Sequence, residues 1–329
     1  MMVEAKIPIM LVLGLVVGNL AGTLSGELQV GFYRGKCGFV DVEAIVAGIV
    51  SARFFRDRSI VAALLRLQFH DCFVNGCDAS ILIDGINSEK TALPNASVRG
   101  YDLIDIVKAA VEEACPGVVS CADLIALATR DAVFLSGGGR YNVPTGRRDG
   151  LVSQAQNISL LGPSISVSQA IAAFADKNLS VTDMVLLMGA HSVGVTHCSF
   201  IKNRLYNFQG TGRPDPAMEP VLANILRLRC PKDVPSDSTV NLDQNPFSPF
   251  TVDISYYQNV MLHRGILQID QELGTDPFTR PIVAELATAL DFPIRFGAAM
   301  VRLGTIGVLT CTQGEIRRSC RASNMPPFA

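Results

Sequence analysis

The sequence predicts a mostly α-helical protein with ten or more helices, long loops and minimal β structure. Apolar residues recur at helical spacing in one segment after another, most clearly in Tyr101–Ala114. Strand-like stretches are few and short, near residues 141–143 and 309–315. The chain has 329 residues, of which 49% are hydrophobic and 18% charged, so it can bury a large core and is not disordered.

The helices are expected in a regular order along one domain without internal repeats. Connectors rich in Gly and Pro interrupt the pattern at residues 137–139, 210–216 and 233–249. The periodicity predicts helices over residues 40–56, 60–69, 101–114, 121–134, 166–177, 182–188, 197–206, 215–228, 253–264, 280–290 and 293–303.

Residues 1–25 have the pattern of a signal peptide, which leaves one mature domain over residues 26–329. Lys6 precedes an apolar run over residues 7–17, and small residues follow it. A retained membrane anchor is the alternative, but a spanning helix needs about 20 apolar residues and this run is shorter. We therefore expect secretion, with no membrane partner after the signal is removed.

The overall charge gives no indication of a nucleic-acid partner. The net charge is -2, and no run of five or more basic residues occurs.

Nine cysteines in a secreted chain predict a disulfide framework. Eight of them can pair in 105 ways, so the residues alone do not give the connectivity. No CxxC pair is present, which argues against a zinc ribbon or a thioredoxin-type site.

The stretch LLRLQFHDCFVNGCDASILID, residues 64–84, concentrates polar residues beside an apolar helix. Arg66 and His70 are four residues apart and share one face of that helix. An imidazole that moves a proton beside a cation that stabilises negative charge is a catalytic arrangement. A satisfied core histidine with a surface arginine is the plainer alternative.

Oxygen-bearing residues follow at loop spacing: Asp71, Gly76, Asp78 and Ser80. Hard cations such as Ca²⁺ bind several oxygens, including backbone carbonyls. A disulfide between Cys72 and Cys77 would fix such a loop, although an ordinary acidic turn explains the pattern equally well.

A second candidate histidine lies in MGAHSVGVTHC. His191 follows a short apolar helix, where it could ligate a metal or haem or simply cap the helix. His197 is six residues further on and would not share a helical face with it.

Together these residues resemble the secretory plant haem peroxidases, known as class III. The motifs that carry the resemblance are the residue 64–84 stretch, ACPGVVSCADLIALATRDAV, VPTGRRDG, GAHSVGVTHC and NRLYNF. The resemblance covers nearly the whole mature chain, from LQVGFYRGKC to GEIRRSCR. The resemblance implies the haem-peroxidase fold, in which the helices sandwich one haem b, over residues 26–329.

Position by position, the resemblance assigns catalytic roles on the distal side of the haem to His70, Arg66 and Asn95. Phe69 corresponds to the aromatic residue on the peroxide side, and Glu89 to a carboxylate of the same polar network near the distal calcium. His191 corresponds to the proximal iron ligand, and Asp270 to the carboxylate that accepts its other ring N–H.

The resemblance also implies two Ca²⁺ ions and four disulfides. The distal ion would use Asp71, Val74, Gly76, Asp78 and Ser80, and the proximal ion Ser192, Asp243, Ser248, Thr251 and Asp253. The proximal loop is about two residues longer than usual in the family. The implied disulfides are Cys37–Cys115, Cys72–Cys77, Cys121–Cys320 and Cys198–Cys230. Cys311 stands outside these pairs, where the family usually has Gly.

Some positions depart from the family pattern. Leu161 replaces a Pro that lines the aromatic-donor site in relatives, and Ser59 and Ala63 replace residues that often hold the haem propionates. Of three Asn-x-Ser/Thr sites, Asn157 and Asn178 are candidates for glycosylation. Asn95 is the third, and its expected burial argues against a glycan there.

The implied activity is the reduction of hydrogen peroxide and the oxidation of small phenolic donors in two one-electron steps. Cell-wall phenol oxidation, lignin formation and the response to oxidative stress are the expected settings. Since the chain ends shortly after Cys320, we expect the extracellular space or cell wall rather than the vacuole, and a monomer. The alternatives are a non-catalytic cell-wall binding protein on the same fold and a cysteine hydrolase using Cys72.

Overall fold

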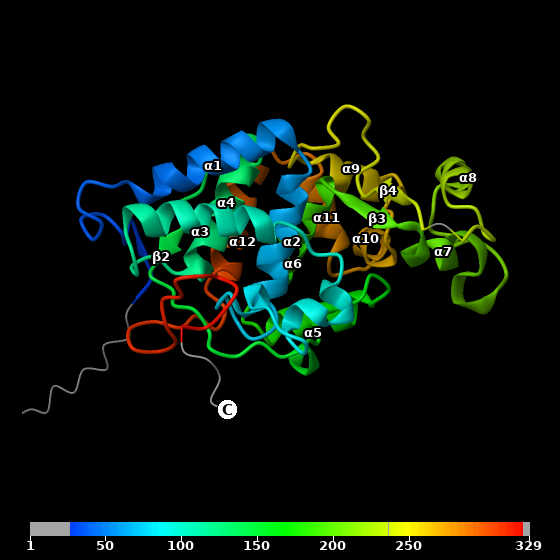
Figure 1. Cartoon of the computed structure of the whole chain (residues 1–329). Helices are drawn as coiled ribbons and strands as arrows, with labels where there is room; N and C mark the ends of the chain where they lie inside the picture. The colour runs from blue at the N-terminus through cyan, green and yellow to red at the C-terminus, as the bar shows by residue number, and fades with distance from the viewer. Residues whose placement is uncertain (1–26, 236, 325–329) are drawn as a thin grey trace, which may run out of the picture.

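The computed structural model describes residues 27–235 and 237–324, so the expected signal peptide lies outside the described residues. It confirms the mostly α-helical class (Figure 1). No helix in these ranges is at once long and apolar enough to cross a bilayer. The twelve α-helices are α1 Val42–Arg56, α2 Ile60–Cys72, α3 Tyr101–Ala114, α4 Cys121–Leu135, α5 Val167–Ala175, α6 Val181–Met188, α7 Lys202–Tyr206, α8 Pro220–Arg229, α9 Ser255–Met261, α10 Gln268–Leu273, α11 Arg280–Leu286 and α12 Phe292–Leu303.

Side-chain caps explain why several helices begin where the sequence predicts. The Asp41 side chain accepts the Ala44 N–H at the start of α1, and Ser120 caps α4 in the same way. Ser166 and Ser180 form capping boxes at α5 and α6.

Helix α4 is the centre of the first half of the fold. Thirteen of its fifteen residues are buried, and it packs against α1, α2 and α3. Helix α6 packs against α5, α11 and α12 in the second half. The elements that bring the two halves together are α2 and the short 3₁₀ helix Gly189–Ser192, which directly follows α6.

The β structure consists of two short antiparallel pairs among the described residues. Strand β1 (Gln29–Val30) pairs with β2 (Pro144–Thr145), and β3 (Val195–His197) pairs with β4 (Thr239–Asn241). The strand predicted near residues 141–143 lies directly after them, at Pro144–Thr145. The strand predicted near 309–315 does not form, since Leu309 and Glu315 make only isolated bridges with Arg148 and Asp149.

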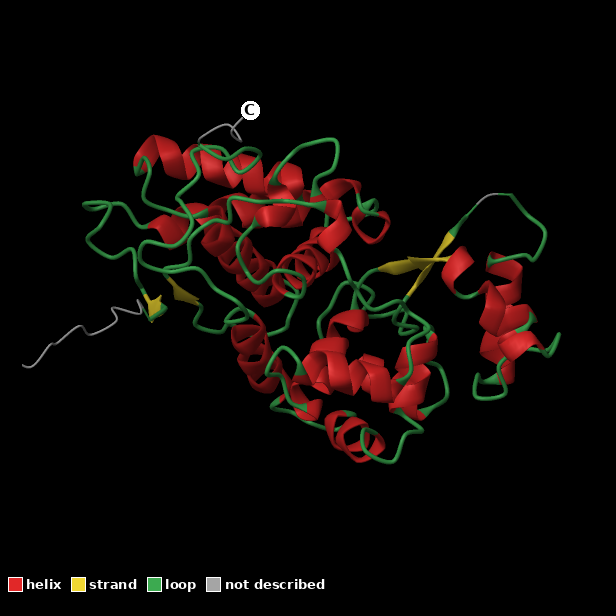
Figure 2. Ribbon diagram, turned by 90° about the horizontal axis from the view of Figure 1, so that it is seen from below, coloured by secondary structure: helices red, strands yellow, loops and turns green. Residues whose placement is uncertain are grey.

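The predicted helix over residues 197–206 was wrong in its first half. His197 ends β3, a 3₁₀ turn follows at Cys198–Phe200, and only Lys202–Tyr206 is α-helical. The pairing with β4 and the Cys198–Cys230 disulfide impose this path. Figure 2 shows that the strands lead to α7 and α8, which project from the remaining helices.

The predicted helix over 215–228 begins late, at Pro220. Asp215 is used instead as the buried partner of Arg204. The short helix α10 was not predicted.

The structure contains the four disulfides that the resemblance implied: Cys37–Cys115, Cys72–Cys77, Cys121–Cys320 and Cys198–Cys230. The Cys72–Cys77 bond removes Cys72 as a thiol nucleophile, so the hydrolase alternative was wrong. Cys311 is exposed and has a φ of 52°, a conformation that Gly adopts without strain.

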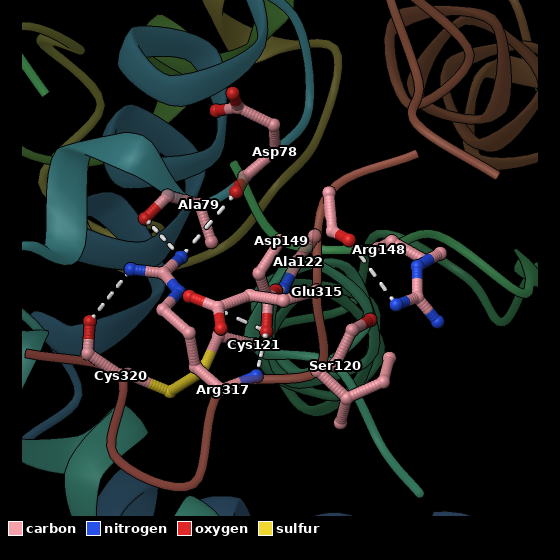
Figure 3. A network of polar contacts seen from close by, with 12 residues as sticks. Asp78, Ala79, Ser120, Cys121, Ala122, Arg148, Asp149, Glu315, Arg317 and Cys320 are labelled. Carbon is pink, nitrogen blue, oxygen red and sulfur yellow. Dashed lines mark hydrogen bonds and ion pairs between the residues drawn. A yellow bond between two sulfur atoms is a disulfide. The ribbon is translucent and has the colours of Figure 1, made fainter. Parts of the chain in front are cut away.

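The chain segment after α12 holds the loop that follows α2. Figure 3 shows the Arg317 guanidinium between three backbone carbonyls, with distances of 2.7 Å to Ala79, 2.9 Å to Cys320 and 3.3 Å to Asp78. The Arg317 N–H also donates to the buried Asp149 carboxylate at 2.9 Å. The loop is therefore positioned by residues more than 200 positions away in the sequence.

Close backbone packing makes the same connection at Gly76, which has a φ of 117°. A Cβ at this position would lie 2.5 Å from the carbonyl oxygen of Gly307, so only glycine fits.

Candidate functional site

Helix α2 exposes only one narrow stripe. Ten of its thirteen residues are buried, and the exceptions are Ala62, Arg66 and Phe69, which share one helical face. A Cβ at Gly194 would lie 2.9 Å from the Ala62 Cβ, so this face meets the segment that follows α6. The predicted distal residues therefore lie next to the segment that carries His191.

The hydrogen bonds of His70 define its tautomer. Its Nδ1 lies 2.6 Å from Asn95 Oδ1, while the Asn95 amide donates to the Glu89 carbonyl at 2.8 Å. Since Asn95 Oδ1 can only accept, Nδ1 carries the hydrogen and Nε2 is the basic nitrogen. Burial lowers the pKa of His70 to about 4; the Asn95 hydrogen bond opposes this effect, and the Arg66 charge adds to it.

Glu89 contributes to this network differently from the prediction. Its backbone carbonyl, and not its carboxylate, contacts Asn95. The carboxylate accepts a hydrogen bond from Asn75 at 2.8 Å and faces the predicted distal calcium loop.

Arg66 is held close to His70 by several acceptors. Its Nε donates to His70 Nε2 at 3.2 Å, Nη1 to Ser97 Oγ at 3.0 Å and Nη2 to the Pro94 carbonyl at 2.9 Å. A fixed cation therefore lies beside a neutral imidazole. Ser97 and Pro94 were not predicted, and no sequence pattern identifies them.

The second predicted site histidine, His191, lies in the 3₁₀ helix Gly189–Ser192, and its side chain is 28% exposed. Its Nδ1 lies 2.8 Å from Asp270 Oδ1. Burial alone would lower the pKa of His191, but the Asp270 carboxylate outweighs that effect and raises it. With Nδ1 bound to a carboxylate, Nε2 is the nitrogen that can ligate a metal.

Asp270 is completely buried and accepts three hydrogen bonds. Besides His191, the Leu267 N–H donates to its Oδ2 at 3.0 Å, and the Tyr256 hydroxyl donates to Oδ1 at 3.0 Å. The Tyr256 ring also meets the His191 ring edge to face, with centroids 6.0 Å apart. Tyr256 was not predicted, since no spacing in the sequence relates it to Asp270.

These side chains suit a haem. The accessible stripe of α2 carries an aromatic ring and a cation beside a basic imidazole. The neighbouring segment carries a second imidazole with Nε2 as its ligating nitrogen, which is the axial donor that haem iron takes.

The predicted distal calcium loop contains three buried oxygen atoms without a hydrogen-bond partner: Asp71 Oδ1, Ser80 Oγ and Glu89 Oε2. Burial raises the pKa of Asp71 well above its usual range, and the nearby charges of Asp78 and Glu89 raise it further. Burial likewise raises the pKa of Glu89 to about 7. Unpaired oxygens among buried acids fit a hard cation, which would supply the missing charge.

The backbone members of this set are also present. Gly76 O accepts the Asp78 N–H at 2.8 Å, and Val74 O accepts from Lys177 Nζ at 2.8 Å. No three His, Cys, Asp or Glu side chains gather as a metal site within the described residues. The fit therefore rests on a mixture of carboxylate, hydroxyl and carbonyl oxygens, as Ca²⁺ accepts.

The predicted proximal calcium loop brings together part of its set. The Ser255 hydroxyl bonds to both Asp243 and Asp253, and it lies 3.4 Å from Ser248 Oγ. Ser192 Oγ is buried without a partner. Thr251 follows in the same loop, where its N–H donates to the Ser248 carbonyl. Ser255 was not predicted, although its position two residues after Asp253 is a signal that could have been used.

An open groove of about 600 Å³ contains Leu161 and lies where the resemblance places the aromatic-donor region. Its walls are mainly apolar and include Leu160, Leu161, Pro163, Ile165, Phe200 and Asn203.

The three Asn-x-Ser/Thr sites differ in accessibility. Asn157 and Asn178 are exposed, whereas Asn95 is 1% exposed and hydrogen-bonded to His70. A buried side chain in a polar network cannot carry a glycan.

Comparison with known proteins gives consistent similarities. Residues 46–289 match the family model described as Peroxidase. Peroxidase 60 of Arabidopsis thaliana is 50% identical over 321 residues, which cover 97% of this chain and 96% of the relative. Peroxidase 44 of the same plant is 51% identical over 310 residues, covering 93% and 96%. Peroxidase 5 of Vitis vinifera is 43% identical over 312 residues, covering 93% and 94%.

Proposed function

The chain belongs to the peroxidase family and is a haem peroxidase, and on this premise we propose that it is a secreted enzyme that oxidises small phenols with hydrogen peroxide. The observation that carries the proposal is the pair of histidines on neighbouring elements, each bonded through Nδ1. Asn95 holds His70 and Asp270 holds His191, so that each Nε2 is the reactive nitrogen.

His191 Nε2 would ligate the iron of haem b, and Phe69 and Arg66 on α2 would line the same haem site. When bound, the haem supplies the two electrons that reduce peroxide and takes two back, one at a time, from the donor. Asp270 orients the His191 ring and makes it a stronger electron donor.

His70 is proposed to move the proton in the peroxide step. Its Nε2 would accept a proton from one oxygen of hydrogen peroxide and deliver it to the other oxygen, which leaves as water when the O–O bond breaks. Arg66 stabilises the negative charge that develops on the departing oxygen. Asn95 keeps Nδ1 protonated and Nε2 basic throughout.

Phenolic donors are proposed to bind in the groove that contains Leu161 and Phe200. Apolar walls favour an aromatic ring, and each donor gives one electron and one proton. Two donors are therefore consumed for each peroxide. Lignin precursors and other cell-wall phenols have this chemistry.

Two Ca²⁺ ions are proposed to bind, one in the distal and one in the proximal calcium loop. The distal ion would be coordinated by oxygens of Asp71, Ser80 and the neighbouring backbone carbonyls. The proximal ion would be coordinated by oxygens of Ser192, Asp243 and Asp253. Because Asp71 directly follows His70, the distal ion would fix the end of α2 and with it the imidazole.

Secretion as a monomer to the extracellular space or cell wall is proposed, with residues 1–25 as the signal peptide and 26–329 as the haem peroxidase domain. Four disulfides are typical of an oxidising compartment. Exposed Asn157 and Asn178 are the proposed glycosylation sites.

The proposed function is tested by the absorption spectrum of the purified, calcium-loaded protein. We expect a strong ferric haem band that changes on addition of one equivalent of hydrogen peroxide and returns on addition of guaiacol. A haem band that does not respond to peroxide would contradict the assigned distal site. Folded protein without a haem band would instead support the non-catalytic binding-protein alternative.

Removing calcium is expected to lower the thermal unfolding midpoint by about 5–10 °C, because a ligand at 100 times its Kd stabilises by about 2.7 kcal/mol. Differential scanning calorimetry with EGTA, and then with Ca²⁺ or Mg²⁺ restored, measures this. Only Ca²⁺ should restore the midpoint. The Asp71→Asn variant should lose the part of the response that comes from the distal ion and keep the part that comes from the proximal ion, and an undiminished response in that variant would contradict the distal assignment.

A further inference from the structure

We propose that Tyr256 limits how strongly Asp270 makes His191 an electron donor, and so tunes the haem reduction potential. The inference rests on the proposed function, since it takes His191 as the axial ligand. It concerns a residue three positions after Asp253 of the proximal calcium loop, which the sequence motifs did not assign to the site.

The geometry places two donors on one oxygen. Asp270 Oδ1 accepts from His191 Nδ1 at 2.8 Å and from the Tyr256 hydroxyl at 3.0 Å. Each hydrogen bond to a carboxylate oxygen stabilises its negative charge and lowers its attraction for a further proton. The Tyr256 hydroxyl therefore competes with His191 for the charge of Oδ1.

Burial makes this competition effective. Asp270 is 0% and Tyr256 2% exposed, so the carboxylate charge is screened little by solvent. The Leu267 N–H holds the other oxygen at 3.0 Å, which fixes the orientation of the carboxylate. Without the Tyr256 hydroxyl, more charge would remain on Oδ1, and the bond from His191 Nδ1 would strengthen.

The ring of Tyr256 has a separate, structural role. It meets His191 and Tyr257 edge to face, with centroid distances of 6.0 and 5.0 Å. Tyr256→Phe keeps these ring contacts and removes only the hydroxyl, so it separates tuning from packing.

The chain offers a matched control in the next residue. Tyr257 is equally buried, but its hydroxyl donates to the carbonyls of Val185 and Leu186 at 3.0 and 3.2 Å, and not to Asp270. Tyr257→Phe therefore removes a buried hydroxyl from the same helix without changing the carboxylate.

The test compares the haem-loaded wild type, Tyr256→Phe and Tyr257→Phe. Spectroelectrochemical titration gives the ferric/ferrous midpoint potential, and resonance Raman spectroscopy gives the iron–imidazole stretching frequency. In Tyr256→Phe we expect a more negative potential and a higher stretching frequency, because the imidazole becomes the stronger donor. Tyr257→Phe should match the wild type in both measurements.

A third comparison tests the route through Asp270. In an Asp270→Asn background, Tyr256→Phe should cause no further shift in the potential, because no carboxylate charge remains to be shared. An unchanged potential in Tyr256→Phe, or equal shifts in both tyrosine variants, would overturn the inference while leaving the peroxidase function intact. A wild-type protein that binds haem without reacting with peroxide would overturn the proposed function but not the tuning role; failure to bind haem would overturn both.

Discussion

Replacing His70 with leucine is expected to slow the reaction with hydrogen peroxide by roughly 10²–10⁴-fold while the ferric haem band is retained. The imidazole Nε2 is the base held beside Arg66, and leucine fills similar space without a proton acceptor. Stopped-flow absorbance at the haem band gives the second-order rate constant.

The matched control is His263→Leu, which removes an exposed histidine whose ring lies near the Ala217 carbonyl. Its rate constant should equal that of the wild type. If His70→Leu also reacted at the wild-type rate, the assignment of the distal base would be wrong.

The pH dependence of the same reaction follows from the environment of His70. Because burial lowers its pKa to about 4, the imidazole is neutral and able to accept a proton throughout the range above that value. The rate constant should be level from pH 7 to about 5 and should fall about tenfold per pH unit well below 4. A decline centred near pH 6.5 would mean that the imidazole is not held as described.

Replacing Arg317 with methionine is expected to lower the free energy of unfolding by about 3–5 kcal/mol. The change leaves the buried Asp149 without its nearby cation and the carbonyls of Asp78 and Ala79 without their donor. The urea midpoint of the calcium-loaded, disulfide-intact protein measures the loss.

The adjacent arginine provides the control, since Arg318 is exposed. Arg318→Met should change the unfolding free energy by less than about 0.5 kcal/mol. If both variants lost the same unfolding free energy, the positive charge of an arginine in this segment would stabilise the protein, and not the hydrogen bonds from Arg317 to the backbone carbonyls.

The sequence predicted helices best where a cap or a long apolar face defined them. Tyr101–Ala114 was predicted to the residue, and the capped helices at Ser120, Ser166 and Ser180 to within two residues at either end. The short α10 and the strands of two or three residues were missed, because so few residues give no detectable period.

The contacts of the site likewise fall into those that sequence motifs predicted and those that they did not. The motifs around His70 and His191 predicted a hydrogen-bond partner for each histidine, and the structure contains both bonds, to Asn95 and to Asp270. Tyr256 and Arg317 were not assigned, because their contacts join segments that only the tertiary fold brings together. The motif did not reveal that Asn95 bonds to the backbone carbonyl of Glu89, because a motif does not distinguish a backbone oxygen from a side-chain oxygen.

The ribosome synthesises the loop after α2 early and the segment after α12 near the end of translation. The Cys77 N–H donates to the Ile306 carbonyl at 2.9 Å, and the Asp84 N–H to the Arg321 carbonyl at 2.8 Å. Helices α1 to α4 can pack as they leave the ribosome, since their contacts are mutual. The loop with the proposed distal calcium ligands, however, is held by hydrogen bonds to residues from Ile306 onward. We therefore expect a chain truncated before residue 306 to form helices but not to order this loop. Catalytic competence would therefore arise only after translation ends.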